Sequence, residues 1–89
     1  MRAVITVIGK DMVGILARVS TICAESGVNV IEVTQSVMQD LFVMIMMVDI
    51  SKSSIPFSEL SDRLNGLGDE LGLTIHTMHE DIFNAMHRI

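Results

Sequence analysis

The sequence predicts an α+β fold: four antiparallel strands form one sheet, two helices cover one of its faces, and a short helix ends the chain. Three observations lead to this prediction. The 89 residues, 49% of them hydrophobic, suffice for one core and not for two, so we expect a single domain over residues 1–89. β-Branched apolar runs alternate with segments in which apolar residues recur at helical spacing. These segments follow the order strand, helix, strand, strand, helix, strand, which is typical of two crossover units around a central hairpin.

The first strand, over residues 2–8, is almost wholly apolar and ends at Gly9. A run of this length that is apolar on both faces is typical of a central strand. A helix is predicted over residues 14–26. Its apolar positions form one stripe, made by Ile15, Leu16, Val19, Ile22 and Cys23. Asp11 can cap the start of this helix, and Gly27 suits the left-handed conformation that often ends one.

A hairpin follows, with strands over residues 28–39 and 41–50. The first of these strands is the more polar, and its alternation breaks at Val30 and Ile31, which suggests a bulge or a bend. The second contains eight consecutive apolar residues from Leu41 onward and is too short for a membrane helix. We therefore expect the second strand in the centre of the sheet and the first at its edge.

The last part of the chain predicts a helix over residues 56–71, a strand over 73–79 and a helix over 81–88. Pro56 suits the first turn of a helix. The apolar residues of that helix recur at spacings of three and four: Phe57, Leu60, Leu64, Leu67 and Leu71. The resulting sheet order is 4-1-3-2, the ferredoxin-like βαββαβ sandwich, and it places the two most apolar strands in the middle.

The composition argues against several classes of partner. Six Lys and Arg against eleven Asp and Glu give a net charge of −5, and there is no Trp or Tyr, so neither nucleic acid nor an anionic membrane is expected. The apolar stretch at the start ends at Gly9, and a stretch of this length is too short for a signal peptide or a membrane span. The lone Cys23 cannot form an internal disulfide, which fits a reducing compartment, so we expect a cytoplasmic protein.

No residue pattern indicates catalysis, a metal site or a cofactor. His76 and His79 are three positions apart on a predicted strand and therefore point to opposite faces. His87 has no carboxylate at a recognisable ligand spacing. Cys23 lies on the apolar stripe of its helix and is interpreted as a small buried side chain, not a nucleophile. We therefore expect a protein that is not an enzyme and holds neither metal nor cofactor.

Two short segments carry a family resemblance. The loop between the first strand and the first helix holds an acidic residue and then a glycine, Asp11 and Gly14, and a Gly-x-Asn pattern ending at Asn29 opens the second strand. In these features the chain resembles the ACT domain, a small regulatory module that binds amino acids in many biosynthetic enzymes and regulators. The resemblance in topology spans nearly all 89 residues. One departure is Val13, which stands where a proline commonly precedes the glycine.

Two further segments narrow the resemblance. The opening over residues 3–11 and the ending over residues 82–86 are most similar to stand-alone bacterial ACT-domain proteins and to the ACT modules of glycine-cleavage regulators. This resemblance implies a homodimer that holds an amino acid or a similar small ligand at its interface.

The ligand-binding residues that we expect are Asp11, Gly14, Ile15, Leu16, Asn29, Val30 and Ile31. Backbone N–H groups at a helix start suit a carboxylate, and a glycine there lets the ligand approach closely. Asp11 can accept hydrogen bonds from an ammonium group, and Asn29 can both donate and accept. Asn29 is expected beside the Asp11–Leu16 loop, at or across the dimer interface. A purely structural interpretation stays open: Asp11 caps the helix, Gly14 eases a turn and Asn29 begins a strand.

The dimer is also predicted from the edge strand. The segment from Val28 to Met38 carries a single charge, Glu32, and a long edge with so little charge is an aggregation hazard unless it is covered. Two-fold pairing of these edges would form a continuous eight-stranded sheet.

The functional hypothesis is a regulatory module that binds an amino acid and modulates a protein partner. The alternative is a ligand-free interaction module that docks its partner as a homodimer.

Overall fold

The computed structural model describes residues 1–10 and 14–87, with side chains up to residue 85. Its elements are β1 (Arg2–Gly9), α1 (Ile15–Glu25), β2 (Asn29–Met38), β3 (Leu41–Asp49), α2 (Phe57–Leu71), β4 (Thr74–His79) and α3 (Glu80–His87). Each predicted strand and helix is present, and no boundary differs by more than one residue.

The four strands form one sheet in the order β2-β3-β1-β4, and all three pairs are antiparallel. The predicted ferredoxin-like topology is therefore confirmed. In the centre, Ile5 of β1 lies opposite Met46 of β3 and Thr77 of β4. The predicted irregularity is also present, because the pairing of β2 with β3 shifts register between Val30 and Glu32 and leaves Ile31 as the extra residue of a bulge.

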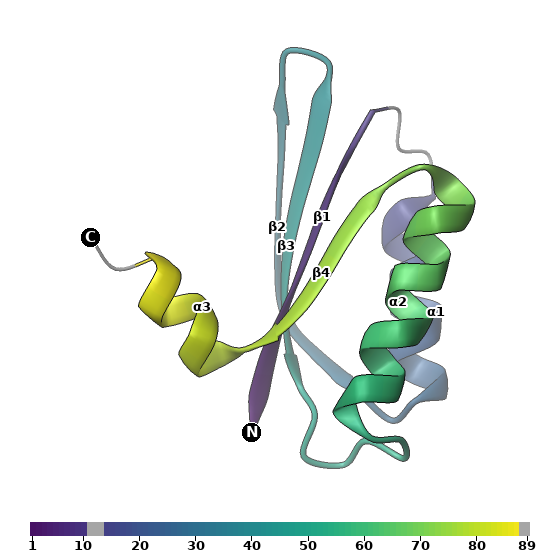
Figure 1. Ribbon diagram of the computed structural model, residues 1–89, viewed down its shortest axis with the longest axis vertical. Helices are drawn as coiled ribbons and strands as arrows, with labels where there is room; N and C mark the ends of the chain where they lie inside the picture. Colours follow the sequence, from purple (N-terminus) through teal and green to yellow (C-terminus); the bar gives the residue numbers. More distant parts are fainter. Residues whose placement is uncertain (11–13, 88–89) are drawn as a thin grey trace.

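Figure 1 shows the sheet between two unequal layers, with α1 and α2 on one side and α3 on the other. Side chains alternate along β1, so Ala3, Ile5 and Val7 face α1 and α2, whereas Val4 faces the opposite side. Val4 is nonetheless fully buried, because α3 packs there against β1 and β4. The sequence predicts this terminal helix but not the face that it covers.

The main core lies between the sheet and the two long helices. Ile5, Met44, Met46, Leu60 and Leu64 are its largest fully buried hydrophobic side chains. The apolar stripes of the helices explain the packing, although their outer members differ: Leu16 and Leu71 are exposed, and Phe57 is half-buried.

Cys23 is fully buried in this core, and burial raises the pKa of its thiol to about 11. A thiol held neutral in this way is a poor nucleophile. The interpretation of Cys23 as a core side chain is therefore confirmed.

Candidate functional site

The start of α1 is the first part of the candidate site. Gly14 is the N-cap residue and has a left-handed backbone, with φ of 79°. A Cβ added at this position would meet no atom of the described residues within 4 Å, so the left-handed conformation is the reason that a glycine suits this position. Ile15 points into the core, and Leu16 beside it is 38% exposed. Asp11 lies outside the described residues.

The N–H groups of this first helical turn receive no side-chain cap from Gly14. The first intrahelical hydrogen bond to Gly14 comes from the N–H of Arg18, which lies 3.0 Å from the Gly14 carbonyl oxygen. Gly14 has no side chain with which to cap the N–H groups before Arg18, and the first turn contains no acidic residue. Exposed N–H groups at the positive end of a helix dipole favour an anionic ligand such as a carboxylate.

The start of β2 is the second part of the candidate site. Asn29 is exposed, Val30 is half-buried, and Ile31 in the bulge is 46% exposed. Asn29 lies on the wall of a pocket of about 350 Å³ whose other lining residues are Gly27, Asp49, Ser51 and Lys52.

One chain does not bring the two parts together. Asn29 is paired with Asp49, which is paired in turn with Arg2 at the beginning of β1, whereas Gly14 follows the other end of that strand. β1 has eight residues, so its ends are about 23 Å apart at 3.3 Å per residue. Figure 1 shows the start of α1 at the top of the molecule and the start of β2 at the bottom.

Asp49 is the acidic residue that lines the pocket beside Asn29, and sequence reasoning missed it. Its carboxylate accepts a hydrogen bond from the backbone N–H of Ser51 at 2.8 Å and lies 3.9 Å from the amino group of Met1. Hydrogen bonds from the Ser51 hydroxyl and N–H, and then the charges of the amino group and Arg2, hold the pKa of Asp49 below its usual value. The available signal is the hairpin itself, because antiparallel pairing places the end of the third strand beside the start of the second.

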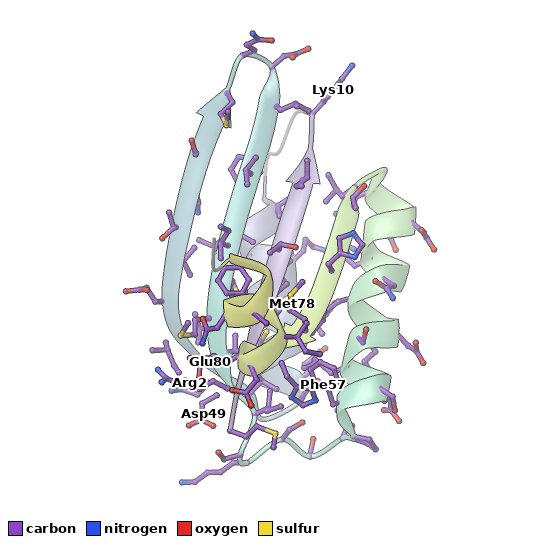
Figure 2. The ribbon with its side chains drawn as sticks, turned by 60° about the vertical axis from the view of Figure 1, so that its left-hand side comes forward. Arg2, Lys10, Asp49, Phe57, Met78 and Glu80 are labelled. Atoms are coloured by element: carbon purple, nitrogen blue, oxygen red, sulfur yellow. The ribbon has the colours of Figure 1, made fainter. Side chains whose placement is uncertain are left out.

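A second pocket, of about 500 Å³, lies where β4 meets α3. Its lining residues are Met1, Arg2, His79, Glu80, Asp81 and Ile82. The Arg2 Nε atom is 3.2 Å from a Glu80 carboxylate oxygen, and this ion pair ties the N-terminus to the start of α3 (Figure 2). His79 stacks on Phe57 with the ring centroids 4.2 Å apart, so it is a packed side chain. Opposite charges already pair across this pocket.

The described residues give no indication of a metal centre or of a membrane segment. Between residues 1 and 10 and between 14 and 87, no three His, Cys, Asp or Glu side chains form a group that could hold a metal ion. Over the same residues, no helix is both long and apolar enough to cross a membrane.

Comparison with known proteins shows the family. A model of the ACT domain matches residues 2–78. A UPF0237 protein from Listeria innocua is 51% identical over 89 residues, which cover the whole of both chains. The solved structure of an ACT domain protein from Streptococcus pneumoniae has a TM-score of 0.81 and 37% identity, and the match covers 98% of each chain.

A regulator is among the similar structures. A proposed glycine cleavage system transcriptional repressor has a TM-score of 0.73 at 25% identity, over 85% of this chain and 43% of its own. The resemblance to glycine-cleavage regulators is therefore confirmed at the level of structure. The chain belongs to the ACT domain family, whose members are typically regulatory ligand-binding domains.

Proposed function

We propose that this chain is a regulatory protein that binds an amino acid or a similar small ligand between two copies of itself, and that the ligand changes how the dimer meets a protein partner. The observation that carries the proposal is the start of α1. There, the described residues leave open space where a Cβ of the left-handed glycine would lie, and its lack of a side chain leaves the first N–H groups of the helix without a cap from the N-cap residue.

The chemistry of this helix start suits the carboxylate that all amino acids share. The N–H groups of Ile15 and Leu16 would donate hydrogen bonds to it, and the helix dipole would add electrostatic stabilisation. Asp11 would accept hydrogen bonds from the ligand's ammonium group, and Asn29 with the backbone of Val30 and Ile31 would complete the site.

The apolar surface beside β2 supports a dimer. β2 is an edge strand with Glu32 as its single charge. The Arg18 guanidinium contacts Glu70 of α2 at 2.6 Å, and helical periodicity therefore places Leu16 on the opposite flank of α1, toward the β2 edge. Leu16, Ile31 and Val37 are 38%, 46% and 72% exposed, so pairing of two β2 edges would bury apolar surface that one chain leaves in water.

The same pairing would complete the ligand site. A two-fold axis through paired β2 edges makes the two α1 helices antiparallel neighbours, because each α1 packs against its own β2. The start of α1 in one copy then lies beside the end of α1 in the other, and Asn29 of the partner subunit follows that end. Gly14 of one chain and Asn29 of the other would thus meet, although they are at opposite ends of each single chain.

A thermal scan against the twenty amino acids tests this proposal. A ligand at 100 times its dissociation constant stabilises the folded state by about 2.7 kcal/mol, which for a domain of this size raises Tm by about 10–20 °C. We expect at least one amino acid to give such a shift. Asn29→Ala should remove most of it, and the matched control Asn65→Ala, at an exposed position of α2, should leave it unchanged.

Two results would contradict the proposal. If Asn29→Ala retains the full shift, the ligand binds elsewhere. If no amino acid raises Tm while the dimer captures a defined protein partner, the chain is the ligand-free interaction module instead.

A further inference from the structure

The face of the sheet that bears α3 is only partly covered. Val4, near the start of β1, is fully buried under α3. Ile8, four residues later on the same face, is 40% exposed. Figure 2 shows α3 in front of the lower half of the sheet, and no other described helix or strand lies in front of the upper half. The uncovered half, which we call the bare face, has an apolar centre formed by Ile8, Met38, Leu41, Val43 and Ile45.

The five residues at the centre of the bare face carry no charge. Strand alternation places Thr34 and Ser36 of β2 and Thr74 and His76 of β4 at its sides. Glu32 of β2 lies at its lower border, and Lys10, which follows β1, lies at its upper end (Figure 2). Two bare faces can therefore meet through their apolar centres, with Glu32 and Lys10 at the rim of the contact.

The shape of this side of the molecule is self-complementary. α3 projects from the lower half of the sheet, and its residue Ile82 is 52% exposed. Consider a two-fold axis in front of this face, parallel to the sheet and perpendicular to its strands. Rotation about this axis produces a second copy whose sheet faces the first and whose strands run the opposite way. The α3 helix of each copy then packs on the bare face of the other, and both helices lie side by side between the two sheets.

The area is sufficient for a specific contact. Four strands about 4.8 Å apart, over about five residues of 3.3 Å each, make the bare face roughly 300 Å² in projection. The two-fold arrangement uses two such faces and the outer surfaces of both α3 helices. The buried surface is then on the order of 1,000 Å², the lower limit of specific protein interfaces.

We propose that the bare face and the outer surface of α3 form a second self-association surface, through which two copies of this chain pack sheet to sheet. This surface is separate from the β2 edge, so two edge-paired dimers would assemble into a tetramer. Ile45 in the centre of the bare face and Ile82 on α3 are the residues expected to meet across it. Their exposure in one chain, 36% and 52%, is what the contact would remove.

Sedimentation equilibrium of the full chain tests the proposal with two variants and one control. Ile45→Glu and Ile82→Glu each place a carboxylate in the contact, and each should halve the mass of the assembly while the far-UV circular dichroism stays that of the wild type. Asn65→Glu, on the exposed side of α2, adds the same charge away from both surfaces and should not change the mass. Leu16→Glu, beside the β2 edge, should break the edge-paired dimer instead.

The outcomes separate the two surfaces. If both Ile45→Glu and Ile82→Glu sediment as the wild type does, or if the wild type is a monomer, the proposal is overturned, whatever Leu16→Glu does. If they halve the mass and Leu16→Glu has no effect, the sheet-to-sheet contact stands and the edge-paired dimer fails. A lipid surface is the competing explanation. If the wild type floats with phosphatidylcholine vesicles and Ile45→Glu does not, while both have the same mass in sedimentation equilibrium, the proposal is also overturned.

Discussion

Gly14 has a backbone conformation that other residues adopt only under strain. Its φ of 79° costs an L-residue about 1–2 kcal/mol, and a Cβ there would meet open space. We therefore expect Gly14→Ala to lower the free energy of unfolding by about 1 kcal/mol through strain alone. Gly14→Asn should cost less, because asparagine tolerates this conformation. Urea unfolding of both variants measures the difference, and an alanine variant as stable as the wild type would contradict it.

Asp49 makes stability depend on pH in a defined direction. Because its pKa is lower in the folded chain than the ordinary value of 3.8, its contribution is fully present above that value and is lost as the pH falls through the folded pKa. Asp49→Asn should therefore be less stable than the wild type at pH 7, and the gap should close in strong acid. Denaturant unfolding at pH 7 and at pH 2.5 checks this, and a gap that persists at the lower pH would show a cause other than the charge.

Gly14 was predicted as a site residue from the sequence, whereas Asp49 was not. Gly14 stands at the junction of a clear strand and a clear helix, so local pattern finds it. Asp49 belongs to its pocket only through the register of β3 with β2, and Met1 and Ser51 reach it from other parts of the chain. The predicted hairpin indicates that Asp49 lies near Asn29, but no local pattern indicates the contacts with Met1 and Ser51.

Two glycines of α2 test the packing of this helix against β4. A Cβ at Gly68 would lie 2.9 Å from the Leu73 carbonyl oxygen and 3.2 Å from Ile75, whereas a Cβ at Gly66 would meet nothing within 4 Å. Gly68→Ala should therefore destabilise the chain by about 1–3 kcal/mol through overpacking. Gly66→Ala should stabilise it by up to about 1 kcal/mol, because alanine is the better helix former. Equal effects of the two substitutions on Tm would show that α2 does not pack as described.

The helices and strands with strong periodicity or long apolar runs were predictable from the sequence. The side of the sheet on which a helix packs was less predictable. The eight apolar residues of β3 and the leucine stripe of α2 each indicate one structure, and the hydrophobic pattern then selects the order of the strands. The face that α3 covers was not predictable, because a helix that follows β4 directly can turn toward either side of the sheet. The burial of Val4 shows which side α3 covers, and only the three-dimensional structure reveals that burial.

At the scale of the whole molecule, the proposed site needs two chains. Gly14 and Asn29 lie at opposite ends of one chain, and two-fold pairing of β2 edges would bring one residue from each copy together. The resemblance to ACT domains led to both residues, while the sequence did not reveal that a single chain separates them. The reason is that α1 spans the length of the sheet between the two positions.

Mixing two inactive variants tests this central claim most directly. Gly14→Val and Asn29→Ala should each abolish or greatly weaken binding of the amino acid identified in the thermal scan. When equal amounts are unfolded together and refolded, half of the dimers carry one chain of each kind, and each of these has one intact site if the site is shared. Isothermal titration should then recover about a quarter of the wild-type binding capacity at wild-type affinity, as expected for an interface shared by two-fold symmetry. A mixture that binds no better than the separate variants would contradict a site shared between two copies.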